Sequence, residues 1–460
     1  MKHTYTLLIP LCAALLGTAP VASAKELSDT TQEKEMAIVF VKTSKAKEIA
    51  DILARDRAKG PGETPVPHFA IHTRDNKFVL TIGGKINPII GADFGNDLYT
   101  VLDKNNGFIT DAIPVPSQSG RRSNFYINAL NTEVDLQAVG FGGTDNQITG
   151  YVRLGTNGQS AQVQLKRAWI SWRGITIGKK TTLFEDNYAA SPTTIDPQGP
   201  CGIVATTVYE ASYVSKSYSG FKFGVGINMP SFYTASGVYL GEDYMKWEGQ
   251  DIVGKNVCDP MGCSQSIPDV PLFVEWGKTP LNRIRLSGIL RNFRYRDILE
   301  GKNRYCPGWG VQLSGNLNPI EPLIFYASAV YGAGIGAYIQ DLQGVPLSFV
   351  PDNDHPGKMK ASPMMGLTFG VTYNFSKKWQ ANAAISRTSL WDVDKYAVHA
   401  TTNPGAQDNY RYANYVAANV LYNISSYLQV GLEYLWGQRA TYGMGKAHDN
   451  RLEIGVQFML

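Results

Sequence analysis

The chain has 460 residues, enough for two or three ordinary domains or for one large β-barrel. Charged residues make up only 18%, the formal net charge is +4, and there is no block of Lys and Arg, so a nucleic-acid partner is not expected. The 25 Tyr and 46 Gly residues favour β-structure with many turns and an aromatic interface.

The N-terminus has the features of a secretory signal peptide over residues 1–24. Lys2 and His3 precede the apolar run LLIPLCAALLG, and the small residues of a cleavage site follow at Ala22–Ala24. No later stretch has the roughly 18 apolar residues of a membrane-spanning helix. We therefore expect an exported mature chain that does not cross a membrane with helices.

Residues 25–66 are predicted to form a short periplasmic helical segment and a linker. In SKAKEIADILARDRAKG, the residues Ala46, Ile49, Ala50 and Leu53 share one helical face with charges around it. The stretch PGETPVPHF follows and is typical of a stiff, extended linker. So short a helix cannot bury an apolar face alone. It therefore packs on the next domain, forms a coiled coil with copies of itself, or contacts another periplasmic component.

From residue 67 to residue 460 the sequence repeatedly alternates between apolar and polar residues, as half-buried β-strands do. The last such segment, RLEIGVQFML, continues to the final residue of the chain. Sixteen segments of this kind are predicted, at about 77–91, 123–140, 146–156, 161–173, 174–183, 205–217, 220–229, 270–277, 281–297, 306–317, 322–334, 363–375, 378–391, 409–423, 427–440 and 449–460.

The connections between these segments indicate the fold class. Short turns follow the even-numbered segments and long loops follow most odd-numbered ones, which is the plan of an all-β, up-and-down, antiparallel transmembrane barrel. In lipid a sheet must close, so the last strand is expected to pair with the first. A soluble sandwich or propeller is the alternative. Aromatic residues near strand ends favour the membrane: Trp379, Tyr422, Tyr427, Tyr434 and Trp436.

The predicted location is the outer membrane of a Gram-negative bacterium, with membrane lipid and lipopolysaccharide as surroundings. Sixteen strands depend on two weak segments, and losing one hairpin would leave fourteen. A barrel of this size has a lumen wide enough for water, so inward residues set what passes.

Strand parity predicts which charged residues point into the lumen. The acids are fewer than the bases, and such an excess concentrates anions; the alternative is that inward charges pair and brace the wall. The expected inward bases are Lys85, Arg153, Lys166, Arg283, Arg285, Arg291, Arg411, Arg439 and Arg451, and the acids are Glu133, Asp135, Glu210, Glu433 and Glu453.

The long loop at 184–204, FEDNYAASPTTIDPQGPCGIV, follows the fifth segment and carries Glu185, Asp186 and Asp196. Together with RRSNF, EVDL, LKRAWISW and ITIGKKTTLFED, it resembles the trimeric DcaP-like porins, in detail from Ser123 to Pro200 and in plan over the barrel. In porins the loop after the fifth strand folds into the lumen and narrows it.

The resemblance implies a homotrimer, with a periplasmic N-terminal extension, that passes small anionic solutes such as dicarboxylates. It places Lys166, Arg167, Lys179 and Lys180 opposite the acids of the 184–204 loop, which would create a transverse field across the constriction. Passive diffusion with mild anion preference is the expected function. The alternative is a structural or adhesive barrel, with a plugged lumen, whose long external loops bind partners.

The mature chain has four cysteines, Cys201, Cys258, Cys263 and Cys306, an even number that favours two disulfides in an exported protein. Cys258 and Cys263 are close enough to close a small loop, which leaves Cys201 with Cys306. A metal site is the rival interpretation, but no His accompanies them. No catalytic motif surrounds the five mature His residues, so we expect no enzyme, metal or cofactor.

Overall fold

The computed structural model describes residues 52–53 and 69–459, except for residues 74, 97, 99–101, 103–105, 116–122, 158–159, 190, 231–245, 248–249, 252–266, 298–299, 346, 353–354, 356–357 and 394–408. The expected signal peptide, most of the expected helical segment, and Cys258 and Cys263 therefore lie outside the described residues. Within the described part, no helix is long and apolar enough to cross a membrane.

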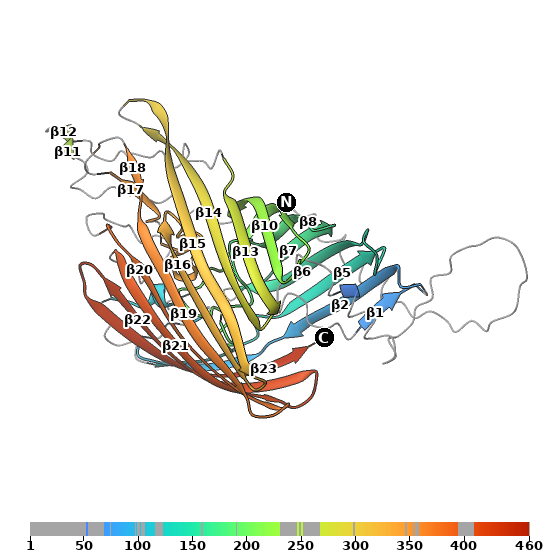
Figure 1. Cartoon of the computed structure of the whole chain (residues 1–460). Helices are drawn as coiled ribbons and strands as arrows, with labels where there is room; N and C mark the ends of the chain where they lie inside the picture. Colours follow the sequence, from blue (N-terminus) through green and yellow to red (C-terminus); the bar gives the residue numbers. More distant parts are fainter. Residues whose placement is uncertain are drawn as a thin grey trace, which may run out of the picture. The chain divides into compact units, whose positions relative to one another are not determined.

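Regular structure in these residues is almost entirely β (Figure 1). The principal strands are β1 (Phe69–His72), β2 (Phe78–Ile86), β3 (Ile89–Phe94), β4 (Ser123–Asn128), β5 (Glu133–Gly140), β6 (Ile148–Asn157), β7 (Ser160–Trp172), β8 (Ile175–Thr181), β9 (Thr207–Val214), β10 (Phe221–Pro230), β13 (Val270–Thr279), β14 (Asn282–Asp297), β15 (Lys302–Ile320), β16 (Leu323–Ala333), β19 (Pro363–Asn374), β20 (Trp379–Leu390), β21 (Tyr410–Asn423), β22 (Leu428–Thr441) and β23 (Lys446–Met459). Short elements in the connections are β11 (Lys246–Trp247), β12 (Gln250–Asp251), β17 (Phe349–Pro351), β18 (Met359–Ala361) and the 3₁₀ turns η1 (Thr110–Ala112) and η3 (Gln340–Leu342).

The principal strands form one antiparallel sheet that closes on itself. β23 pairs with β3 and, at its end, with β2, so the last strand meets the first; in Figure 1 the red β23 ends beside the blue β2. The predicted closure is confirmed. The bonds between the first and last strands leave no open sheet edge in lipid.

Sixteen strands make up the ring in the described part of the chain, as predicted, and not fourteen. β2 and β3 are two halves of one barrel strand, interrupted at Asn87 and Pro88, and β4 and β5 are likewise halves of the next. Pro88 has no N–H to donate to the ladder. β1 lies outside the ring and pairs with the part of β2 that extends past the end of β23.

The barrel wall is polar inside and apolar outside, the reverse of a soluble protein. Along β14, Arg283, Arg285 and Ser287 are buried, whereas the alternate residues Ile284 and Leu286 are half exposed. Aromatic residues contact one another near the ends with short turns, as Trp379 and Tyr422 do at 4.5 Å between ring centroids. Interfacial aromatic rings and an apolar outer band are features of transmembrane barrels.

Of the N-terminal segment, the described residues Ile52 and Leu53 pack against the barrel. They are buried with Val79 of β2 and Val139 of β5, and the Gln147 side-chain amide donates a 3.0 Å hydrogen bond to the Ile52 carbonyl. These two residues therefore pack on the barrel, which is the first of the three arrangements expected for the helical segment.

Candidate functional site

The barrel interior has a charged wall on β2, β5, β6 and β7. Register places Lys85 opposite Glu133 and Asp135 opposite Arg153. Arg153 Nε lies 2.6 Å from Asp135 Oδ1, and Arg153 Nη1 lies 3.6 Å from Glu133 Oε2. Lys85 Nζ is 4.0 Å from the same Glu133 oxygen. One carboxylate is thus shared by an ammonium and a guanidinium.

A bulge in β7 turns two consecutive basic residues toward this wall. Arg153 pairs with Arg167, the next pair joins Leu154 and Leu165, and Lys166 is the extra residue between them. Strict alternation would send one of these bases outward, but a bulge shifts the parity of the strand. Because of this bulge, which the sequence alone does not reveal, the side chains of Lys166 and Arg167 can both point into the barrel.

Lys179 was expected with the interior bases but lies on the outer face. It pairs in register with Tyr209, an exposed residue of β9, and its Nζ donates a 2.8 Å hydrogen bond to the Leu165 carbonyl. The next residue, Lys180, is buried inside, 2.8 Å from Glu210 Oε1. Without a bulge, β8 can turn only one of the two lysines inward.

The loop between β8 and β9, residues 182–206, lies inside the barrel and is fixed at its base by buried charges. Asp186 is paired with Arg283 of β14 and accepts a 2.6 Å hydrogen bond from Ser314 of β15. Arg285 donates to the Leu183 carbonyl. Burial alone would raise the pKa of Asp186, but the charges of Arg285 and Arg283 outweigh it and hold that pKa below its ordinary value.

The same loop is closed by its own residues and by the wall beneath it. The Glu185 carboxylate accepts a 2.8 Å hydrogen bond from the Thr206 N–H, and Glu210 accepts a 2.9 Å hydrogen bond from the Leu183 N–H. Arg291 is engaged elsewhere: its Nε lies 2.9 Å from Asp269 Oδ2, and its guanidinium lies over the Tyr338 ring. The predicted bases of β14 therefore hold loops and act as braces.

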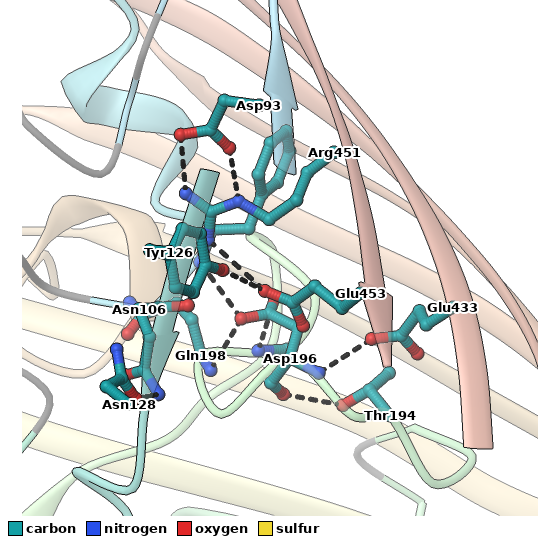
Figure 2. A network of polar contacts seen from close by, with 12 residues as sticks. Asp93, Asn106, Tyr126, Asn128, Thr194, Asp196, Gln198, Glu433, Arg451 and Glu453 are labelled. Atoms are coloured by element: carbon teal, nitrogen blue, oxygen red, sulfur yellow. Dashed lines mark hydrogen bonds and ion pairs between the residues drawn. The ribbon is translucent and has the colours of Figure 1, made fainter. Parts of the chain in front are cut away.

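The middle of the loop is held on the opposite wall through Asp196 (Figure 2). The Asp196 N–H donates a 2.6 Å hydrogen bond to Glu433 of β22. The Asp196 carboxylate accepts hydrogen bonds from the Tyr415 hydroxyl at 2.9 Å and the Phe108 N–H at 2.9 Å. Burial raises the pKa of Asp196, although hydrogen bonds from Phe108 and Gln198 oppose the shift.

A second part of this network joins the first and last strands. Arg451 Nε of β23 lies 2.5 Å from Asp93 Oδ1 of β3, and Arg451 Nη1 lies 3.4 Å from Glu453 Oε1 (Figure 2). The Tyr126 hydroxyl donates a 2.6 Å hydrogen bond to the same Glu453 oxygen. All of these side chains are buried. Strand parity predicts Arg451, Glu433 and Glu453 inside, but gives no sign that Glu433 holds the loop.

The interior also contains an apolar cluster that sequence reasoning missed. The loop residues Phe184 and Val204 pack with Ile335, Tyr338 and Leu342, which come from the connection after β16. η3 in that connection is held by Asp341, which accepts a 2.7 Å hydrogen bond from Thr110 of η1. The apolar stretch YGAGIGAYIQDL (331–342) is unusual for an exposed loop and is the signal that could have revealed this cluster.

Between the loop and the charged wall lies a cavity of about 430 Å³. Lys85, Glu133 and Lys166 form one side of it, and residues 191–197 of the loop form another. Gln429 and Gln457 complete the polar lining. Of the predicted residues, Lys85, Glu133, Lys166 and Asp196 thus line one cavity, in which the loop and the basic wall face each other across open space.

The expected Cys201–Cys306 disulfide is wrong, because both thiols are free and buried. Cys201 lies in the loop with its Sγ 3.6 Å from the Ser386 hydroxyl of β20, whereas Cys306 of β15 packs with Phe293 and Phe349. The two belong to different side-chain clusters. Burial raises the pKa of the Cys201 thiol to about 12.

No protein-family model matches the chain, and no curated protein sequence matches it. Among solved structures, the outer membrane channel DcaP of Acinetobacter baumannii matches with a TM-score of 0.63 and 15% sequence identity, over 85% of this chain and 99% of that chain. The chain has the DcaP fold.

Two further solved structures are less similar. Outer-membrane expressed OmpT of Vibrio cholerae has a TM-score of 0.48 and 11% identity, over 85% of this chain and all of that chain (100%). OprB of Pseudomonas putida has a TM-score of 0.47 and 11% identity, over 84% and 95%. At these TM-scores neither likeness carries an argument. The DcaP fold and the apolar exterior of the barrel place the chain in the outer membrane.

Proposed function

We propose that the chain is a passive diffusion channel for small hydrophilic solutes, with a mild preference for anions such as dicarboxylates. The observation that carries the proposal is the cavity between the loop at 182–206 and the wall that bears Lys85 and Lys166. The loop is anchored on two sides of the interior, so it narrows the lumen at that cavity. The DcaP fold supports the proposal, since DcaP is an outer membrane channel.

The charges around the cavity favour anions. Glu133 is already shared by Lys85 and Arg153, and the Asp196 carboxylate is engaged by the Phe108 N–H and the Tyr415 hydroxyl. Lys166 takes part in none of the ion pairs found among the described residues. An unbalanced ammonium beside a narrow polar passage raises the local anion concentration, because low-dielectric walls focus its field.

The test is the reversal potential of the purified protein in a planar bilayer under a KCl gradient. We expect a shift toward the chloride potential that K85Q/K166Q abolishes. K278Q is the matched control, because Lys278 is an exposed lysine near the short turn between β13 and β14. An unshifted wild-type potential would refute the anion preference. A silent bilayer, from protein that shows heat-modifiable migration, would refute the channel.

The second candidate is a barrel with a plugged lumen whose external loops bind partners. The apolar cluster of Phe184, Tyr338 and Leu342 favours it, because the packed loops fill part of the interior. The silent bilayer described above is the outcome that would support it over the channel.

We also propose a homotrimer, on the resemblance of the sequence to the trimeric DcaP-like porins. Conductance steps in threes and the mass of the detergent-solubilised protein test this. Deleting residues 25–66 tests whether the N-terminal segment holds the assembly: an intact trimer after deletion would show that the barrel alone is sufficient.

A further inference from the structure

The outer face of the barrel has a hollow of about 1090 Å³ that the channel does not use. It crosses β14, β15, β16, β19, β20 and β21, which are neighbours in the sheet. Five interstrand spacings of about 4.8 Å make it roughly 24 Å long, longer than the roughly 15 Å of one leaflet in a hydrocarbon core about 30 Å thick.

Small side chains on the lipid-facing side create this hollow. Ala327 and Ala329 of β16 lie between larger outward residues, Leu313 of β15 on one side and Leu367 and Phe369 of β19 on the other. Those three large side chains are 39–52% exposed. The result is an apolar trough that follows the rows of paired residues across the strands, wide enough for a hydrocarbon chain.

Arg387 of β20 stands near the β21 end of the trough and points outward. It pairs in register with Leu367 and Asn414, donates a 3.0 Å hydrogen bond to Asn414 Oδ1, and stacks with its Cζ 4.1 Å from the Tyr412 ring centroid. No carboxylate of the described residues forms an ion pair with it. A guanidinium beside lipid is costly without an anionic partner.

The height of Arg387 in the membrane follows from a row of aromatic rings. The ring centroids of Trp309 and Tyr331 lie 5.9 Å apart, and those of Tyr331 and Trp391 lie 6.4 Å apart. Tyr331 is near the end of β16 and Trp391 directly follows β20, and a long connection follows each of these strands. Such rings lie at the membrane–water interface. Arg387 lies four residues before Trp391, which directly follows β20, and its side chain extends toward the strand end to the ring of Tyr412, the partner of Ser389. This reach brings the guanidinium close to the interface.

A second base lies near Arg387. Strand parity predicts Arg411 inside, but a bulge between Tyr410 and Tyr412 leaves it exposed on the outside. Its Cζ is 6.0 Å from the Tyr412 ring and 5.6 Å from the Tyr442 ring. Arg387 and Arg411 thus share the Tyr412 ring.

We propose that this trough binds the lipid A part of lipopolysaccharide, with an acyl chain over Ala327 and Ala329 and a phosphate on Arg387. The planar guanidinium fork matches a phosphate with two parallel hydrogen bonds. The occupant is a lipid because the trough opens to the bilayer and two exposed guanidinium groups, those of Arg387 and Arg411, lie together near its β21 end. The site lies on the outer face, so it is independent of solute passage through the lumen.

The test is native mass spectrometry of the folded, detergent-solubilised protein incubated with diphosphorylated lipid A, with dephosphorylated lipid A, or with phosphatidylcholine. We expect wild type to retain the phosphorylated form preferentially. R387Q should lower its retention about fivefold and remove the preference between the two lipid A forms. A329F should lower retention of both forms, because the ring fills the trough. R173Q is the control, since Arg173 also stacks on an aromatic ring, Trp172, at 5.1 Å.

Several results would overturn the proposal. Retention unchanged in R387Q and A329F would show that the lipid binds elsewhere. A329F altering the oligomeric mass, with lipid retention intact, would make the trough an interface between copies of the chain. Equal retention of phosphatidylcholine would remove the role of the phosphate. A327L, a smaller change, serves if A329F loses heat-modifiable migration.

Discussion

The N–H of Asp196 donates a 2.6 Å hydrogen bond to Oε1 of Glu433, 237 residues further along the chain. This contact joins the loop at 182–206 to the strand next to the barrel closure. The other oxygen of Glu433 accepts a 2.6 Å hydrogen bond from Asn419 of β21. The position of the loop therefore depends on one buried carboxylate whose two oxygens face different elements.

Replacing Glu433 with alanine should loosen the loop. The change leaves the Asp196 N–H and one of the two Asn419 amide N–H groups without an acceptor, at a cost of about 1–3 kcal/mol for each unsatisfied group, while the other Asn419 N–H keeps its bond to the Thr193 carbonyl. In single-channel recordings we expect E433A to show higher open-channel noise than wild type. E300A, at an exposed glutamate, is the control. Identical noise in E433A and wild type would mean that the loop is held without this contact.

The two loop acids should respond to pH in opposite ways. Asp186 has a lowered pKa, so its contribution to stability is fully present above about pH 3.8, the ordinary pKa of an aspartate. That contribution is lost only as the pH falls through the lower pKa that Asp186 has in the folded protein. Asp196 has a raised pKa, so its contribution to stability is fully present below about pH 3.8, where the carboxyl is protonated. That contribution is lost as the pH rises through the higher pKa that Asp196 has in the folded protein.

Urea unfolding of D186N and D196N between pH 4 and pH 7 checks this difference. The stability gap between wild type and D186N should stay nearly constant over the range. The gap between wild type and D196N should shrink as the pH rises. The amide in D196N faces N–H and O–H donors and lowers stability at every pH. The informative quantity is therefore how the free energy of unfolding changes with pH, and not its absolute value. Parallel slopes for both variants would contradict the assignment.

Gly455 of β23 should not tolerate alanine, because the loop packs directly on it. A Cβ there would lie 2.7 Å from Cγ2 of Ile195, and its three nearest neighbours all belong to that side chain. Overpacking of this kind typically costs about 1–3 kcal/mol. We expect G455A to raise channel noise and G455A/I195A to restore it in part. A double variant no better than G455A would place the strain in the strand.

Strand positions could be predicted because a barrel in lipid obeys one rule, apolar outside and polar inside, along every strand. Leu452, Ile454 and Phe458 follow that rule to the end of the chain, and the sixteen predicted segments correspond to the observed ring. The alternation of inward and outward residues gave the wrong face where the pairing between strands is irregular. Arg411 lies beside a bulge, which moves a side chain to the other face without any change in composition.

The candidate site could be predicted only as a set of inward charges. Which charges meet depends on loops that fold into the barrel, and these contacts join residues far apart in sequence, such as Asp186 with Ser314 and Asp196 with Glu433. The pairing of Cys201 with Cys306 was wrong for a similar reason. An even number of thiols carries no information on distance, and Cys201 became part of the packing between the loop and β20.

The free thiols give a direct chemical test of the loop position. Cys201 is buried against Ser386 and Ala413, and burial raises the pKa of its thiol to about 12, so little thiolate forms at neutral pH. Folded protein should therefore react slowly with a maleimide at Cys201, whereas unreduced, denatured protein should label both Cys201 and Cys306. In E433A, labelling of folded Cys201 should be faster, because the loop is less firmly held. Peptide mapping that finds Cys201 and Cys306 joined would refute the free-thiol assignment, and equal labelling rates in E433A and wild type would show that Glu433 does not control this end of the loop.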